Sequence, residues 1–545
     1  MMRLVLLVAV AVCLDAAAAR AQVGGLHILG TGELQPAAPP QVSAAQPVGA
    51  HGAAVAPLAA AFVLRGVVVE GANSVPGNEL RTAWAPAVGR VVNQAELSRI
   101  AARVGELEGA AGIALYAVSF PSQNFARGVV RIRVTEVSVA HVVIVGETRG
   151  QRLGLLEAYA ERIEASRPLM RAVLERNILL MGDIAGAKVG SRFVPVAGHP
   201  ELVELVLAVR QQKIFGGFGL NNEGAPLLDN TQAVLNAGVN NLFYEGERTQ
   251  FVLGLPLDFS TYQYYGLDDT EPVGHDGWTV TLSAGELVSH PVDHDGVSGN
   301  ATLVGFRVND PVVRSVHRNL IFSVGMDAIN SANAFLGFTD SDERTRALRV
   351  SLSYNDDLYE NGIDQAGATV SEGLYVLGAR RAGPEYGPPD FSKGDFDVER
   401  VQALPYEFAL RVAAQGQFTN DRLPPSEEFD YGGPAFGQAF AAAALTGDEG
   451  IEAVAQLAHP VPVRYVPAPL AGTGLYVLTD YGEIWNRDTV YAPPTDKGAS
   501  FGFGVKFLVV GKFTLELGAA TPVIRPEYAG RNQHWRFIVA TAGHF

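Results

Sequence analysis

From residue 214 to the end, the chain is a succession of strand-length segments and contains no stretch that predicts a long amphipathic helix. Segments such as "TQFVLGLPLDFS", "RALRVSLSYND" and "GLYVLTDYGEIW" are apolar at alternate positions and bounded by Gly, Asp, Asn or Pro, which is typical of strands joined by turns. At ~20 residues per strand and connection, this length predicts about 16 strands of 9–11 residues, as in a transmembrane antiparallel β-barrel. A soluble β-propeller is the alternative, but it would repeat a motif in each blade, and the sequence contains no such repeat.

The chain ends on "RFIVATAGHF", an alternating run whose last residue is Phe545. Phe537, Val539, Thr541, Gly543 and Phe545 share one face of this strand. Periodicity leaves two interpretations open. The run is either an ordinary terminal strand of a soluble sheet or the closing strand of an outer-membrane barrel, with Phe545 in an interfacial aromatic girdle.

The amino terminus has the features of a secretory signal peptide, which we assign to residues 1–21. Arg3 supplies the positive charge, "LVLLVAVAV" is the apolar core, and "ARA" is a small-x-small cleavage site. Cleavage after Ala21 would remove Cys13, the only cysteine of the chain, so the mature protein is expected to have no thiol chemistry and no disulfide. A lipoprotein reading of Cys13 is the alternative, but Val12 is bulky where a small residue is needed.

The charge balance argues against nucleic acid as a partner. The chain has 41 Lys and Arg residues against 57 Asp and Glu residues, a formal net charge of −16, and the basic residues are dispersed. After the signal segment, no run of 18 apolar residues predicts a transmembrane helix. The sequence also lacks Gly-x-Ser-x-Gly, phosphate-loop and His-Glu-x-x-His motifs. It therefore predicts neither a cofactor nor an enzyme.

Between the signal peptide and the barrel, the sequence predicts a linker and two small α+β units. Residues 22–61 are rich in Ala and Pro and almost uncharged, which is typical of a semi-extended linker. Residues 62–137 and 138–212 each carry the order strand, helix, helix, strand, strand, and two helices on a small sheet form a stable architecture. In the first unit, Asn93 is suited to cap a helix. Residues 213–545 are left for the barrel.

One cluster of possible metal ligands lies in "SHPVDHDG", where His290, Asp293, His294 and Asp295 are close in sequence. These residue types suit Zn²⁺. No regular element, however, would aim both imidazoles at one point across Pro291. A polar loop between two strands is the favoured interpretation, and no metal is predicted.

Residues 416–450 carry an ordered set of motifs that resembles one protein family. The stretch "GQFTNDRLPPSEEFDYGGPAFGQAF", followed by "TGDEG", resembles the two-partner secretion transporters (TpsB), the haemolysin and adhesin exporters that share a superfamily with the BamA barrel-assembly proteins. The family order is Gly-Gln, Leu-Pro, an acidic-Phe stretch, two glycines, a Val-Arg-Gly-Phe/Tyr tip and Gly-Asp-x-Gly. The matching residues are Gly416, Gln417, Leu423, Pro424, Glu428, Phe429, Gly432, Gly433, Phe440, Gly447, Asp448 and Gly450.

The tip departs from the family at residues 437–439, where relatives have Val, Arg and Gly. In the family the tip arginine faces the aspartate of a Phe-x-Asp-x-Gly strand motif, which "LTDYG" resembles with Asp480 and Gly482. The resemblance implies that the loop folds back into the barrel lumen and touches this strand. We expect the side-chain amide of Gln438 to donate to Asp480. The alternatives are another cation, water, or an exposed Gln438 with Asp480 facing a wet lumen.

Two earlier segments resemble the family's polypeptide-transport-associated (POTRA) domains. "FPSQNFARG" matches the signature that ends the first domain, at Pro121, Gln123 and Gly128, and "SRPLMRAVLERNILLMGDIAG" matches the second, with Arg176 among the matching residues. The resemblance thus covers nearly the whole mature chain. It implies that Phe545 is the residue by which the barrel-assembly machinery recognises the last strand.

The resemblance implies a non-enzymatic transporter in the outer membrane of a Gram-negative bacterium, with its POTRA domains in the periplasm. Its partner would be a secreted passenger of the large β-helical adhesin or haemolysin type, captured unfolded and exported through the barrel without ATP. Outer-membrane lipid and, during biogenesis, the barrel-assembly machinery are the other implied partners. Two alternatives remain: a BamA-type assembly factor, which two POTRA-like units argue against, and a porin or uptake barrel, which would not need residues 62–212.

Overall fold

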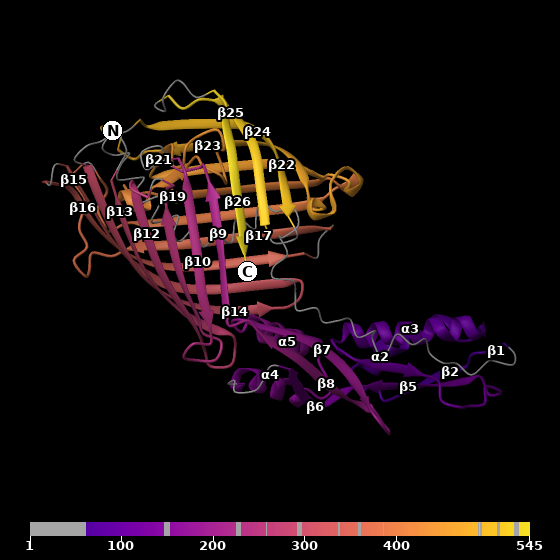
Figure 1. Cartoon of the computed structure of the whole chain (residues 1–545). Helices are drawn as coiled ribbons and strands as arrows, with labels where there is room; N and C mark the ends of the chain where they lie inside the picture. Colours follow the sequence, from indigo (N-terminus) through magenta and orange to yellow (C-terminus); the bar gives the residue numbers. More distant parts are fainter. Residues whose placement is uncertain are drawn as a thin grey trace. The chain divides into compact units, whose positions relative to one another are not determined.

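A computed structural model describes residues 61–146, 153–224, 230–257, 259–290, 297–335, 338–357, 361–384, 386–488, 490, 493–509, 513–527 and 534–544. The predicted signal peptide, the linker up to residue 60 and Phe545 lie outside the described residues, as do Asp293, His294 and Asp295. The described chain forms two compact units, an α+β unit up to residue 212 and a barrel from residue 213; Figure 1 labels their elements.

The first part of the α+β unit has a three-stranded sheet in the order β2-β5-β4, with β2 parallel to β5. Its elements are β1 (Phe62–Val63), β2 (Gly66–Glu70), α2 (Gly77–Leu80), η1 (Arg81–Ala83), η2 (Ala85–Ala87), β3 (Val91–Val92), α3 (Gln94–Ala110), β4 (Tyr116–Ser119) and β5 (Val129–Glu136). The Asn93 side chain accepts a hydrogen bond from the Glu96 N–H at 3.0 Å, which confirms the predicted cap of α3.

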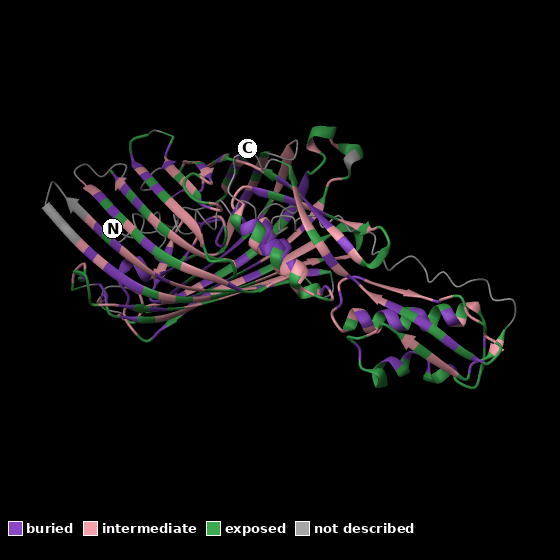
Figure 2. Ribbon diagram, turned by 90° about the horizontal axis from the view of Figure 1, so that it is seen from below, coloured by how far each residue is buried: buried purple, intermediate pink, exposed green. Residues whose placement is uncertain are grey.

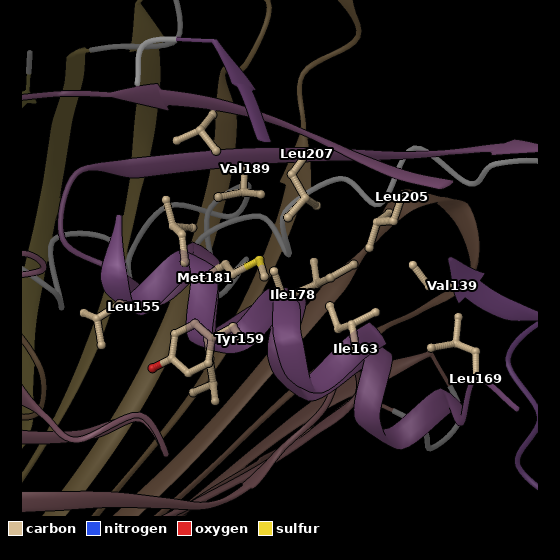
Figure 3. Close-up of a cluster of buried hydrophobic side chains, with 14 of the residues drawn as sticks. Val139, Leu155, Tyr159, Ile163, Leu169, Ile178, Met181, Val189, Leu205 and Leu207 are labelled. Atoms are coloured by element: carbon tan, nitrogen blue, oxygen red, sulfur yellow. The ribbon is translucent and has the colours of Figure 1, made fainter. Parts of the chain in front are cut away.

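The second part repeats the order strand, helix, helix, strand, strand, with a sheet in the order β6-β8-β7. Its elements are β6 (Ser138–Gly146), α4 (Gly154–Ala165), α5 (Arg171–Asp183), β7 (Ala187–Val196) and β8 (His199–Gln211). Figure 3 shows the core, in which Tyr159 and Ile163 of α4 and Ile178 of α5 pack with Leu205 and Leu207 of β8. One apolar stripe on each helix is thus buried against one face of the sheet.

Backbone hydrogen bonds join the two parts of the α+β unit. The Ala114 N–H donates to the Leu169 carbonyl at 2.8 Å, the Leu169 N–H donates to the Val137 carbonyl at 2.9 Å, and the Arg171 N–H donates to the Gly112 carbonyl at 2.8 Å. Leu115, which follows α3, is buried in the core of the second part. The two parts therefore share a packed and hydrogen-bonded joint.

The barrel is closed and antiparallel, and it has the sixteen strands that the sequence predicts. They are β9 (Ile214–Asn221), β10 (Gln232–Asn240), β11 (Arg248–Leu255), β12 (Tyr262–Val273), β13 (Trp278–Ser289), β14 (Val297–Arg314), β15 (Arg318–Phe335), β16 (Phe338–Asp356), β17 (Gly362–Gly373), β18 (Ser392–Ala403), β19 (Ala409–Thr419), β22 (Glu449–Pro460), β23 (Gly474–Trp485), β24 (Thr495–Val509), β25 (Phe513–Ile524) and β26 (Arg536–His544). The last strand, β26, closes the barrel by pairing with β9, from Ala540↔Asn221 to His544↔Gly217.

The strands of the barrel are less uniform than the predicted 9–11 residues. β9 has 8 residues, whereas β16 has 19. A hairpin can continue its hydrogen-bond ladder beyond the thickness of a bilayer, which explains the strands that are longer than predicted. The smaller elements outside these strands are β20 (Phe429–Tyr431), β21 (Leu445–Gly447), η4 (Pro405–Glu407), η5 (Pro425–Glu427), η6 (Val463–Tyr465) and η7 (Ala468–Leu470).

Buried and exposed residues alternate along the barrel strands, as the banding in Figure 2 shows. In β23, Leu475 and Val477 are 51% and 44% exposed, whereas the intervening Tyr476 and Leu478 are buried. In β26, Phe537 and Val539 are exposed and Ile538 is buried. An exposed apolar face is the lipid-facing side of a membrane barrel. The alternation therefore assigns Phe537 and Val539 to that side.

Among the described residues, no helix combines the length and the apolar character needed to cross a membrane.

Candidate functional site

The segment between β19 and β22, which we call the lumen loop (residues 420–448), folds back inside the barrel. It contains a two-stranded ribbon of β20 and β21. The loop covers the face of β23 that carries Asp480 and Ile484, which are 4% and 2% exposed. This face is opposite the exposed apolar face of β23, so the loop lies in the lumen, where the family resemblance implied it.

Two glycines of the barrel wall make room for aromatic rings of the lumen loop. A β-carbon at Gly482 would overlap the ring of Tyr431, and one at Gly450 would overlap the ring of Phe429. Tyr431 also contacts Phe440, with ring centroids 5.7 Å apart. Gly482 therefore has a packing role in the strand motif, because any side chain there would displace the loop.

Asp480 is the wall residue to which the tip of the loop is bonded. Its carboxylate accepts hydrogen bonds from the Tyr431 hydroxyl at 2.7 Å, the Gln438 backbone N–H at 3.2 Å and the Ser500 backbone N–H at 3.1 Å. The Ser500 hydroxyl is a fourth donor. All four donors are neutral. Together they satisfy a carboxylate that would be costly to bury without partners.

The structure brings Gln438 to Asp480 but with a different donor from the one expected. The backbone N–H makes the bond, and not the side-chain amide. The side chain is 3% exposed, and its Oε1 has no hydrogen-bond partner among the described residues. It lies towards β24, because a β-carbon at Gly502 would be 2.9 Å from that oxygen. A backbone donor is available whatever side chain occupies position 438, so the sequence could not identify it.

The bend at the tip begins at the two glycines of the motif. Gly432 and Gly433 have φ of +120° and +116°, and a β-carbon at Gly432 would overlap the carbonyl of Ala441. Phe440, 1% exposed, packs in the same cluster as Tyr431. The guanidinium of Arg536 on β26 donates to the carbonyl of Phe440.

The start of the lumen loop, which we call its root, is held by ion pairs. Glu427 is 1% exposed, and its carboxylate lies 2.7 Å from the guanidinium of Arg349 on β16 and 3.0 Å from the ammonium of Lys393 on β18. Arg349 also pairs with Asp327 on β15 at 2.8 Å. The root thus joins three strands of the wall through a buried charge network.

Hydrogen bonds from two other motif residues support the root. The Gln417 side chain donates to the carbonyls of Glu427 and Asp448, both at 2.9 Å. The Asp448 carboxylate accepts from the N–H of Leu423 and the N–H of Arg487, both at 2.7 Å. These bonds tie together the two ends of the loop, which explains why Gly-Gln, Leu-Pro and Gly-Asp-x-Gly occur in one ordered set.

The signature of the first α+β part fixes the end of its sheet. The Gln123 side chain donates to the Arg131 carbonyl at 2.7 Å and accepts from the Arg131 N–H at 2.6 Å, as a neighbouring strand residue would. Gly128 has φ of +72°, and a β-carbon there would overlap the carbonyl of Val63. Pro121 lies just after β4, and Arg176 lies on α5.

Several residues of the site were not predicted, namely Glu427, Tyr431, Arg349, Lys393 and Arg536. One signal in the sequence pointed towards the wall cations: from Leu423 to Val463 there is no Lys and no Arg. A buried acidic residue in such a loop needs a cation from elsewhere in the chain. The sequence does not say which strand provides it.

The group of possible metal ligands around His290 lies mostly outside the described residues. His290 is described, but its three neighbouring candidates are not. Within the described ranges, no group of three or more His, Cys, Asp or Glu residues is arranged to hold a metal ion.

The comparisons with known proteins agree with this geometry. Residues 203–507 match the family model of the haemolysin secretion/activation proteins ShlB/FhaC/HecB. The chain belongs to this family. Residues 62–136 match the ShlB-type POTRA domain. The chain is thus an outer-membrane transporter of the TpsB family with periplasmic POTRA domains, and not an enzyme.

Individual relatives are distant but similar over most of their length. The heme/hemopexin transporter protein HuxB of Haemophilus influenzae (strain 86-028NP) is 19% identical over 473 residues, which cover 83% of this chain and 82% of HuxB. The structure of CdiB from Escherichia coli has a TM-score of 0.71 at 16% identity, covering 97% of this chain and 98% of CdiB. CdiB from Acinetobacter baumannii has a TM-score of 0.60 at 14% identity, covering 92% and 93%. These two structures share the fold.

Proposed function

We propose that this transporter captures an unfolded secreted partner at its POTRA domains, residues 62–137 and 138–212, and passes it outward through the barrel formed by residues 213–545. The observation that carries the proposal is the lumen loop, which occupies the barrel and is held there by hydrogen bonds, ion pairs and ring packing, all of them non-covalent. Such contacts can break and re-form, so the loop can move aside for a passing chain. Folding of the partner outside the cell would give the direction without ATP.

We infer that the partner docks as an added strand on β7. A strand at a sheet edge exposes backbone donors and acceptors that an extended chain can use. β7 has 10 residues and forms one edge of its sheet. At the opposite edge, the Val142 N–H of β6 already donates to the Glu164 side chain at 2.6 Å. An incoming strand on β6 would have to displace this bond.

The test uses the full chain and the secreted protein encoded by a neighbouring reading frame. Since Cys13 is the only cysteine, Arg192→Cys on β7 yields a mature protein with one thiol. Disulfide trapping with single cysteines along the partner's amino-terminal segment should peak at the position opposite residue 192 and be weak at the two adjacent positions, because neighbouring residues of an added strand face opposite sides. Glu161→Cys on α4 is the control.

Three results would contradict parts of this proposal. Equal trapping from α4 and β7 would rule out docking at β7. Normal export of the partner in cells that lack the transporter would rule out the export function. A general loss of outer-membrane proteins in those cells would favour a BamA-type assembly factor instead.

We further propose that Phe545 is the signal by which the barrel-assembly machinery recognises the last strand. Deletion of Phe545 should lower the amount of protein in the outer membrane several-fold, but the purified variant should refold in detergent as the wild type does. A deletion variant that assembles at the wild-type level in cells would contradict this role.

A further inference from the structure

Beyond Arg422 near its start, the lumen loop carries no cation of its own. The stretch from Leu423 to Val463 has no Lys or Arg, whereas its acidic residues are Glu427, Glu428, Asp430, Asp448, Glu449 and Glu452. The root is neutralised by Arg349 and Lys393 of the wall. The tip lies about ten residues further on and faces the carboxylate of Asp480. All of the donors to that carboxylate are uncharged, so a cation that holds the tip has to come from the wall.

Arg536 reaches the tip from the last strand of the barrel. It lies on the same face of β26 as the buried Ile538, and hence on the lumen side. Its Nη1 donates to the carbonyl of Phe440, and its Nη2 donates to the carbonyl of Asn222, just after β9, at 3.5 Å. One guanidinium therefore joins the loop tip to both strands that close the barrel. A planar fork of donors suits such a double contact, and an ammonium does not.

A buried acid stands next to the second acceptor of this guanidinium. Glu223 follows Asn222 directly in the chain and is 6% exposed. The acid nearest in sequence to the contacts of Arg536 thus belongs to the wall side and not to the loop.

We propose that Arg536 is the positioning residue of the lumen-loop tip, so that the charge-assisted contact of the tip is donated by the barrel wall to the loop backbone. Position 438 is then free to carry an uncharged residue, because the cation stands on β26. The inference bears on export only through the proposed function, in which the loop must leave the lumen. The contact itself is tested independently of export.

The experiment is hydrogen exchange of the purified full chain in detergent, compared between the tip (residues 432–444) and the root (residues 423–429). Arg536→Gln should accelerate exchange at the tip about tenfold, the size expected for loss of one charge-assisted hydrogen bond. Exchange at the root should not change, because Glu427 keeps both of its cations. Arg536→Lys keeps the charge but loses the fork, so it should give an intermediate acceleration of about threefold.

Asn222→Ala is the matched control for an effect through barrel closure. The Asn222 side chain donates to the Phe537 carbonyl at 2.8 Å and accepts from the Val539 N–H at 2.9 Å, so it bonds β26 without touching the tip. This variant leaves both acceptors of Arg536 in place, since both are backbone carbonyls. It should accelerate exchange at residues 537–539 and leave the tip unchanged.

Two results would overturn the proposal. One is a tip that exchanges at the wild-type rate in Arg536→Gln or, if that variant does not assemble, in Arg536→Lys. The other is a tip accelerated as much by Asn222→Ala as by Arg536→Gln, which would show that Arg536 acts through closure alone. Failure of the wild type to export any partner would count only against the proposed function.

Discussion

At the root of the lumen loop a loop carboxylate meets two wall cations, whereas at the tip a wall carboxylate meets four neutral donors. Glu427 lies 2.7 Å from Arg349 and 3.0 Å from Lys393. Asp480 is held by two hydroxyl groups and two backbone N–H groups. Breaking a buried ion pair by removing one partner costs about 3–5 kcal/mol, whereas one hydrogen bond from an uncharged donor to a carboxylate contributes about 1.5–3 kcal/mol. The tip should therefore leave the wall more readily than the root, so that the root acts as the fixed end of a moving loop.

The largest effect is expected from removing Glu427, the residue that anchors the root. Glu427→Ala leaves Arg349 and Lys393 buried without their shared partner, so we expect the root to be destabilised by up to about 3–5 kcal/mol. Hydrogen exchange of residues 423–429 and the temperature at which the purified barrel unfolds both report it. Glu427→Gln, which keeps the volume and can still accept hydrogen bonds, should be less destabilised. A root that exchanges equally in both variants and the wild type would show that the ion pairs do not hold it.

The corresponding change at the tip is Asp480→Ala, for which we expect a smaller loss of about 1–3 kcal/mol, the cost of leaving buried donors unsatisfied. Exchange should rise at residues 431–444 and remain slow at the root. Export of the partner should fall less than when residues 433–441 are replaced by a short glycine linker, because the Tyr431 and Phe440 rings still pack. An Asp480→Ala variant that frees the root as well would contradict a loop with two separate anchors.

Contacts between residues that are close in sequence can be predicted for this site, whereas contacts between residues far apart in sequence cannot. The alternation of apolar residues predicts the barrel, and the motif order predicts that the loop approaches Asp480. The partners of Glu427 are not local, since Arg349 is 78 residues away along the chain, and Arg536 is 96 residues from Phe440. Strand alternation shows which residues face the lumen, but the register and tilt of sixteen strands decide which of them meet the loop. For the same reason, nothing local distinguishes Glu427 from the adjacent Glu428.

Glu108 on α3 is a third buried carboxylate. Unlike Glu427, it is not paired with a cation among the described residues. Glu108 is fully buried, and neither of its side-chain oxygens has a hydrogen-bond partner among the described residues. Burial, and then the negative charge of Glu136, raise the pKa of Glu108 to about 7 from the usual 4.5. Between these values the folded state binds more protons than the unfolded state, so stability should fall as the pH rises from 4.5 to 7.

Glu108→Gln removes this titration and tests the explanation. At pH 8 the variant should be more stable than the wild type by about 1–3 kcal/mol, because no charge is then buried. At pH 4.5 the two should be similar, since the wild-type carboxyl is protonated. Exchange of the α3 backbone in the full chain, corrected for the intrinsic effect of pH, measures both. A wild type that is as stable at pH 8 as at pH 4.5 would mean that Glu108 has a partner in solution.

The smallest effect is expected from removing a single uncharged donor at the tip. Tyr431→Phe removes the hydroxyl that donates to Asp480 and keeps the ring that packs against Gly482. The tip should lose about 1.5 kcal/mol. Tyr481→Phe is a matched control, because its hydroxyl donates to Glu483 on the exposed face of the same strand, where water can replace it. Tip exchange should rise about tenfold in the first variant and stay unchanged in the second. If Tyr431→Phe frees the tip as fully as Asp480→Ala does, then that single hydroxyl holds the tip, and the three remaining donors of Asp480 contribute little.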